Sequence, residues 1–196
     1  MIVFPGDGFE RLLELFDRLE IPYMIGGSDA SSVHGLVRTT GDLDIVAKIA
    51  VEDIPSIVTE LHEDFYVDEQ QMRAALEHSR WFNVIHLRSS YKFDIFPLTT
   101  DLYQQIQFGR RRYEKSSIFT GEPLELAVSS PEDVILSKLR WFRQGGEVSE
   151  QQWNDVLGVI AVQRQNLDVR YLPDWAEYLG ISKLLEQALD EGQAPR

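Results

Sequence analysis

A short segment around residue 26 most constrains what this chain can fold into. Gly26, Gly27 and Ser28 directly follow the apolar run Pro22–Ile25. The apolar run predicts a short strand, the two glycines permit a tight turn, and Ser28 predicts the cap of a helix that continues to about Gly35. Backbone N–H groups at such a turn face outward from the helix start, so the turn is suited to hold phosphate groups.

Acidic residues follow at a spacing typical of a metal site. Asp42 and Asp44 lie at the start of the run Leu43–Ala47, which predicts a second strand. Because side chains alternate along a strand, Asp42 and Asp44 project from the same face. The run Tyr91–Leu98 predicts another strand, in which Asp94 is a lone acid. Three converging carboxylates repel one another unless a divalent cation is present, so they predict a Mg²⁺ site that holds two ions.

Each of these acids also has a structural interpretation. Asp42 can cap a turn after Gly41, and Asp44 can be a buried, hydrogen-bonded acid within an apolar strand. An unpaired carboxylate in such a strand is costly. One divalent ion would compensate the negative charge of all three carboxylates, and we favour the metal interpretation for that reason.

The order of these motifs resembles a known superfamily. Gly26-Gly27-Ser28, then Asp42-Leu43-Asp44, then Asp94 is similar to the nucleotidyltransferases of the DNA polymerase β type. Within that superfamily the text resembles minimal bacterial nucleotidyltransferases, especially the AbiE-type abortive-infection toxins, in which a Gly-Gly/Ser turn precedes an Arg-Thr-x-Asp-x-Asp strand. Arg38 and Thr39 match the start of that strand motif. The resemblance covers roughly residues 20–160.

The resemblance implies a fold and a set of site residues. The implied fold class is α/β (α+β), with a mixed nucleotidyltransferase-type sheet flanked by helices and followed by a C-terminal helical bundle. The implied catalytic residues are Asp42, Asp44, Asp94 and Lys138, and the first three are also the metal ligands. The implied nucleotide-binding residues are Gly26, Gly27, Ser28, Arg38, Lys138 and Asp155. For Lys138 and Asp155 a simple ion pair between two packed helices is the alternative, and for Arg38 the alternative is surface pairing.

The predicted elements divide the chain in two. Strand patterns end near residue 128, and two helices follow with clear start signals, Ser130 before Pro131 and Ser149 with Gln152 as a capping box. We therefore expect a catalytic core over 1–128 and a helical region over 129–196 that packs on the core. The other patterns predict helices at 8–19, 51–61, 69–77, 168–179 and 181–189, a short strand at 65–67, and hairpins that join 81–87 to 92–98 and 118–119 to 124–128.

Composition excludes several classes of protein. The 196 residues include no cysteine, which excludes zinc ribbons and thiol catalysis, and the four histidines show no metal-binding spacing. No long apolar run and no secretion signal is present, so we expect a cytoplasmic protein with no membrane contact. The net charge of -13 argues against a surface that binds nucleic acid everywhere. The cluster Arg110–Arg112 is the best local candidate for steering a triphosphate or an RNA end, and the alternative is a solvated edge paired with Glu114.

Together these patterns predict transfer of a nucleoside monophosphate from a nucleoside triphosphate (NTP) to an acceptor hydroxyl. The resemblance suggests RNA, tRNA or a protein as the acceptor, and a role as the toxin or antitoxin of a paired system. Two alternatives stay open. One is a nucleotide-binding or partner-binding module that catalyses nothing, and the other is an enzyme that modifies a small molecule such as an antibiotic.

Overall fold

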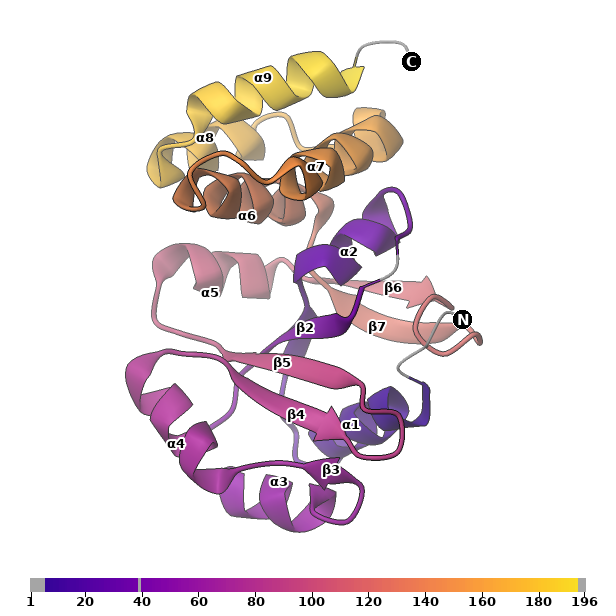
Figure 1. Cartoon of the computed structure of the whole chain (residues 1–196). Helices are drawn as coiled ribbons and strands as arrows, with labels where there is room; N and C mark the ends of the chain where they lie inside the picture. Colours follow the sequence, from indigo (N-terminus) through magenta and orange to yellow (C-terminus); the bar gives the residue numbers. More distant parts are fainter. Residues whose placement is uncertain (1–5, 39, 194–196) are drawn as a thin grey trace. The chain divides into compact units, whose positions relative to one another are not determined.

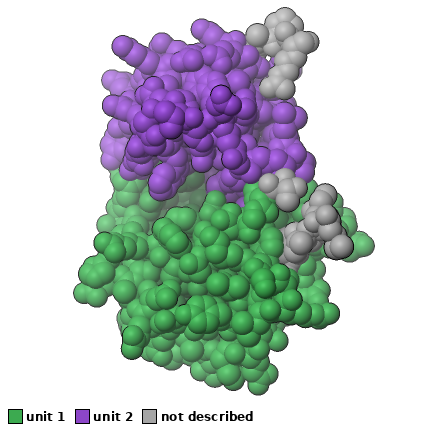
Figure 2. Space-filling model, viewed as in Figure 1, with its two compact units in different colours: residues 1–25, 39–128 green, residues 26–38, 129–196 purple. Residues whose placement is uncertain are grey.

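The computed structural model describes residues 6–38 and 40–193 (Figure 1). Thr39, which matches the start of the strand motif, lies outside the described residues. The chain forms two compact units (Figure 2): unit 1 contains residues 1–25 and 39–128, and unit 2 contains residues 26–38 and 129–196. The domain boundary expected after residue 128 stays a prediction. The two compact units also divide the chain at residue 128, but residues 26–38 belong to the same unit as the C-terminal helices.

Unit 1 is built on a mixed sheet. Its strands in the described residues are β1 (Tyr23–Ile25), β2 (Asp42–Ala47), β3 (Phe65–Tyr66), β4 (Phe82–His86), β5 (Lys92–Pro97), β6 (Arg112–Ser116) and β7 (Leu124–Val128). They form one seven-stranded sheet in the order β3-β4-β5-β2-β1-β7-β6. Strand β2 pairs with β5 in parallel, as β1 does with β7, and the other pairs are antiparallel. The predicted α/β class with a mixed sheet is confirmed.

The helices of unit 1 are α1 (Gly6–Arg18), α3 (Ile54–Leu61), α4 (Glu69–His78) and α5 (Leu102–Gly109). Helix α1 buries one apolar face, and the Phe9 ring stacks on the Phe93 ring of β5 with centroids 6.4 Å apart. Phe93 and Asp94 are neighbours on one strand, so their side chains point to opposite faces of the sheet. Helix α1 therefore covers the face that Asp94 does not occupy.

Several predicted elements of unit 1 agree with the structure, and others need correction. The antiparallel pair of β4 and β5 confirms the predicted hairpin and places β5 inside the sheet. The strand predicted at 118–119 is wrong: β7 pairs with β6 instead, and Phe119 is a buried loop residue whose ring lies 5.3 Å from that of Phe9. Strand β6 is polar and mostly exposed at the sheet edge, so it lacks an apolar alternation. Helix α5 was not predicted, and α3 begins at Ile54 rather than Val51.

Unit 2 is helical in its described residues. It contains α2 (Gly27–His34), α6 (Pro131–Gln144), α7 (Glu150–Gln163), the 3₁₀ turn η1 (Arg164–Asn166), α8 (Tyr171–Leu179) and α9 (Ser182–Gln193). Helix α2 packs against α6 and α7, and α8 and α9 also pack on this group. The predicted starts are confirmed, because the Ser130 and Ser149 hydroxyls accept hydrogen bonds from the backbone N–H groups of Asp133 and Gln152. No helix in the described parts of the chain is both long and apolar enough to span a membrane.

The packing of α1 on β4 gives a stability prediction. A Cβ atom added at Gly8 would lie 2.7 Å from Cγ of the buried His86 ring, which is closer than carbon atoms approach without a shift. We expect Gly8→Ala to lower the free energy of unfolding by about 1–3 kcal/mol, because the overpacked helix must move away from the sheet. Gly109→Ala in α5 is the matched control, since nothing lies within 4 Å of its added Cβ atom.

Urea unfolding of the two variants and the parent checks this. The control should be neutral or more stable by up to about 1 kcal/mol, because alanine is the better helix former. Equal stability of both alanine variants would contradict the close packing of α1 on His86.

Candidate active site

The predicted site residues lie in two sets, one in each unit. Unit 1 holds Asp42, Asp44 and Asp94, and unit 2 holds Gly26, Gly27, Ser28, Arg38, Lys138 and Asp155. Each set is built by its own secondary structure.

The three acids of unit 1 share one face of the sheet. In the parallel pairing of β2 and β5, Asp44 lies directly opposite Asp94, and Asp42 lies two residues before Asp44 on the same strand. Leu43, between Asp42 and Asp44, and Ile45, after Asp44, are fully buried and point to the other face. The expected common face of the three carboxylates is therefore present.

Lys92 also lies on this face, directly opposite Asp42. Its Nζ atom is 3.2 Å from Oδ2 of Asp42 and 3.0 Å from Oδ2 of Asp94. Burial by itself lowers the pKa of Lys92, but the hydrogen bonds to Asp94 and Asp42 outweigh that effect and raise its pKa. Lys92 was not among the predicted site residues, although its position two residues before Asp94 indicates that both side chains share a face of the strand.

A second neighbour fixes Asp94. The Asn83 side chain, opposite Asp94 on β4, donates a hydrogen bond to its Oδ1 atom, while Lys92 donates to Oδ2. Both oxygens of this carboxylate thus have a donor, and the Asp94 residue is only 8% exposed. Asn83 and Lys92 hold the carboxylate in a defined orientation on the sheet face.

The donor chemistry of this set suits a hard divalent cation. Carboxylate oxygens are the ligands that Mg²⁺ prefers, and an ammonium group already binds two of the three carboxylates. With the side chains in these positions, no group of three or more His, Cys, Asp or Glu residues in the described parts of the chain is arranged to hold a metal ion. The residue types therefore fit Mg²⁺, while the Lys92 ammonium group occupies one oxygen of Asp42 and one oxygen of Asp94.

The first set of residues in unit 2 forms the start of α2. Gly26 is the N-cap residue, and Gly27 has a φ of +52°, a left-handed conformation that favours glycine. The prediction that Ser28 caps the helix is wrong, because Gly26 holds that position and no side chain caps α2. The Ser28 hydroxyl instead accepts hydrogen bonds from Arg38 and Lys138, the latter at 3.5 Å. The predicted helix from this turn to about Gly35 is confirmed.

Asp155 links the two basic residues of unit 2. Its Oδ1 atom is 2.9 Å from Arg38 Nε, and its Oδ2 atom is 3.1 Å from Arg38 Nη2 and 2.7 Å from Lys138 Nζ. The side chains of Lys138 and Asp155 are 4% and 8% exposed, so the ion pair between them is almost fully buried. The ion pair considered from the sequence is thus part of a larger cluster that includes Arg38 and Ser28.

Basic side chains of this cluster lie beside the first turn of α2, where both contact the Ser28 hydroxyl. Arg38 and Lys138 share the carboxylate of Asp155, and the buried acid Asp29 also lies in this turn. The first N–H groups of a helix have no partners within the helix, and the helix dipole adds positive potential there. Gln152 was overlooked as a member: its Oε1 atom accepts a hydrogen bond of 3.0 Å from Lys138 Nζ instead of completing the expected capping box.

One arginine of the cluster at 110–112 has a structural role. The guanidinium group of Arg111 lies 4.5 Å from the centre of the Phe108 ring, and its Nη1 atom donates a 2.7 Å hydrogen bond to the Phe108 carbonyl oxygen. This arginine therefore anchors the turn between α5 and β6. A role of the cluster in steering an anion stays a prediction.

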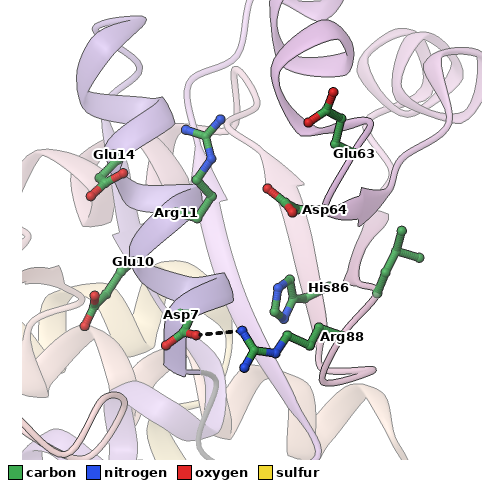
Figure 3. A pocket seen from close by; sticks show the side chains of 9 residues that line it. Asp7, Glu10, Arg11, Glu14, Glu63, Asp64, His86 and Arg88 are labelled. Atoms are coloured by element: carbon green, nitrogen blue, oxygen red, sulfur yellow. Dashed lines mark hydrogen bonds and ion pairs between the residues drawn. The ribbon is translucent and has the colours of Figure 1, made fainter.

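Unit 1 also has a pocket away from its carboxylate set (Figure 3). It has a volume of about 600 Å³ and lies between α1, the end of α3 and the end of β4. Arg88 at its rim pairs with Asp7 of α1 at 3.5 Å, and the buried ring of His86 forms part of its lining. His86 is on the face of the sheet that α1 covers, so this pocket is separate from Asp42, Asp44 and Asp94.

Comparisons with known proteins identify the fold. No model of a known protein family matches the sequence, and no curated protein matches it significantly. The solved structure of an antigenic nucleotidyltransferase-like protein from Paracoccidioides brasiliensis is 18% identical, with a TM-score of 0.51 over 92% of this chain and 89% of that chain. The solution structure of the antibiotic-resistance factor ANT(2'')-Ia is 12% identical, with the same TM-score of 0.51 over 92% of this chain and 89% of that chain. At these identities the likeness concerns the fold, and the chain has a nucleotidyltransferase-like fold.

Proposed function

We propose that this chain transfers a nucleoside monophosphate from an NTP to an acceptor hydroxyl and releases pyrophosphate. The observation that carries the proposal is the register of β2 and β5, which places Asp44 opposite Asp94 with Asp42 on the same face. The nucleotidyltransferase-like fold supports the same reaction class. An anion-binding cluster at the start of α2 supplies the second requirement, a place for phosphate groups.

In this proposal Asp42, Asp44 and Asp94 hold two Mg²⁺ ions. Bound Mg²⁺ stabilises negative charge on the transferred phosphate and on the departing pyrophosphate. The protein contributes three hard oxygen ligands on one rigid face, with Asp94 held by Asn83. Placing the ligands on paired strands rather than on loops keeps their spacing fixed.

The residues of unit 2 bind the phosphate chain in this proposal. Gly26, Gly27 and Ser28 offer backbone N–H groups and a hydroxyl to the β- and γ-phosphates, and Arg38 and Lys138 offer positive charge. Asp155 orients both basic side chains through its two oxygens. Lys138 then offsets the charge that develops on the pyrophosphate as it leaves.

The proposed transfer is a single displacement at the α-phosphorus. The acceptor oxygen forms a bond to this phosphorus, and the bond from the α-phosphorus to the oxygen that bridges to the β-phosphate breaks. The proton of the acceptor hydroxyl passes to a carboxylate oxygen of Asp94 as general base, or to water where Asp94 only aligns the hydroxyl. Pyrophosphate leaves with the electron pair of the broken bond.

We propose RNA, including tRNA, or a protein as the acceptor, and a role in a toxin–antitoxin pair that acts in the cytoplasm. The resemblance to AbiE-type toxins supports this choice. With a net charge of -13, an RNA acceptor has to be bound locally rather than over a broad surface. Because one structure of similar fold is an antibiotic-resistance factor, an aminoglycoside belongs in the same assay as a small-molecule acceptor.

Nucleotidyl transfer is tested directly with α-labelled NTPs. The purified protein is incubated with Mg²⁺ and each labelled NTP, with total cellular RNA, with protein extract, or with an aminoglycoside. We expect label on RNA or protein, and a decrease of roughly a hundredfold or more for Asp44→Asn, because the amide cannot replace an anionic metal ligand. Asp17→Asn on the exposed side of α1 is the matched control and should transfer label at the parental rate.

The outcomes separate the alternatives. Full activity of a folded Asp44→Asn variant would refute the metal assignment. Bound NTP without label on any acceptor would indicate a binding module, and label on the aminoglycoside alone would indicate a small-molecule enzyme.

The role of unit 2 is tested by binding rather than turnover. Lys138→Met keeps an unbranched, buried side chain that is one atom shorter and removes its charge, so we expect the Kd for a non-hydrolysable NTP analogue to rise about tenfold or more. Asp155 keeps its contacts to Arg38 in this variant, so the fold should persist. Lys183→Met on the exposed side of α9 is the control, and equal Kd values for the two variants would exclude Lys138 from the phosphate site.

A further inference from the structure

We propose that Lys92 is an internal counter-ion of the carboxylate set, which a divalent cation must displace, and that Lys92 thereby sets the affinity for the metal. The inference rests on the proposed function in one respect, the assignment of Asp42, Asp44 and Asp94 as metal ligands. It adds a residue that competes with the metal rather than binding it.

Lys92 contacts one oxygen atom of each of two carboxylates. Lys92 Nζ contacts Oδ2 of Asp42 at 3.2 Å and Oδ2 of Asp94 at 3.0 Å, so it joins carboxylates on two neighbouring strands. Mg²⁺ requires its oxygen ligands at about 2.0–2.1 Å. An ion held by the same oxygens would therefore lie within a few ångströms of the ammonium group, and two positive charges at that distance repel strongly.

The Lys92 side chain is able to move away from the carboxylates. Its side chain is 36% exposed, and four flexible methylene groups carry the charge. The Trp81 ring centre lies 6.0 Å from Nζ, so an aromatic face is available as an alternative partner for the cation. A movement toward solvent or Trp81 frees both Oδ2 atoms without any change in the strands.

Asp94 keeps its orientation when Lys92 leaves. Asn83 donates to the other oxygen, Oδ1, and the pairing of β4 with β5 holds Asn83 opposite Asp94. The two donors thus have separate tasks. Asn83 positions the carboxylate, and Lys92 neutralises charge until the metal arrives.

Removing the charge of Lys92 should have two opposite effects. Without Lys92 the metal-free carboxylates repel one another and the protein is less stable, whereas the metal no longer competes with an ammonium group and binds more tightly. An ion pair with only a structural role would give the loss of stability alone. A lysine that only contacts nucleotide would change neither property in the absence of nucleotide.

The test measures Mn²⁺ binding by titration calorimetry, without nucleotide, on the full chain. We expect Lys92→Met to lower the Kd for Mn²⁺ at least about fivefold. We also expect a lower Tm without metal and a larger rise of Tm on adding Mn²⁺. Lys92→Arg retains the charge and should stay close to the parent, and Lys115→Met, an exposed lysine of β6, is the matched control.

Lys92→Gln is a second neutral variant whose amide still donates a hydrogen bond, and it supports the test if Lys92→Met folds poorly. An unchanged or higher Kd in the folded neutral variants, beside measurable binding by the parent, overturns the role of Lys92 and leaves the metal assignment standing. Binding by the neutral variants alone supports the inference in its strongest form. No binding by any variant overturns the metal assignment together with the inference.

Discussion

The parallel pairing of β2 with β5 is the constraint on which the rest of unit 1 depends. It places Leu43 opposite Phe93 and Ile45 opposite Ile95, and all four side chains are buried. The same register places the polar residues of both strands on the opposite face. A slip of one residue would turn the carboxylates toward the apolar core, at a cost far above that of any single contact. One strand pairing therefore specifies both the core packing of this part of unit 1 and the common face of the three carboxylates.

The two sets of site residues differ in the kind of charge they present. In unit 1 Lys92 pairs with two carboxylates, Asp42 and Asp94, and carboxylate ligands suit a divalent cation. In unit 2 two basic side chains share the carboxylate of Asp155 near the start of α2, and basic side chains at a helix start suit a phosphate chain. A metal-bound NTP presents both kinds of charge. This correspondence is specific to the two clusters, because the chain as a whole has a net charge of -13.

Elements whose signals are local were predictable from the sequence, and contacts that depend on tertiary pairing were not. The apolar stripe of α1 and the cap at Ser130 can be recognised within one turn of helix. Strand β6 has no such signal, because it is a polar edge strand ordered by its pairing with β7. Ser28 is a good cap residue in isolation, but α2 already starts at Gly27 with Gly26 as its N-cap, and the Ser28 hydroxyl accepts from Arg38 and Lys138 instead. The position of Lys92 opposite Asp42 follows from the strand register, and a single sequence does not state which strands pair.

Each cluster contains a partner that resembles the ligand it would bind. Lys92 supplies positive charge where a cation would bind, and Asp155 supplies negative charge to the side chains that would hold phosphate. A charged group buried without a partner costs several kcal/mol, so a site that awaits a charged ligand either stays wet or carries its own counter-ion. The counter-ion stabilises the ligand-free protein and weakens binding by the same interaction. The exposed fractions of the two groups differ in a way that fits this exchange: the Lys92 side chain is 36% exposed and able to leave, whereas Asp155 is 8% exposed and tied to Arg38 through both oxygens. Exchange is thus physically easier at the carboxylate face, whereas the contacts of Asp155 with Arg38 and Lys138 favour its retention if phosphate binds.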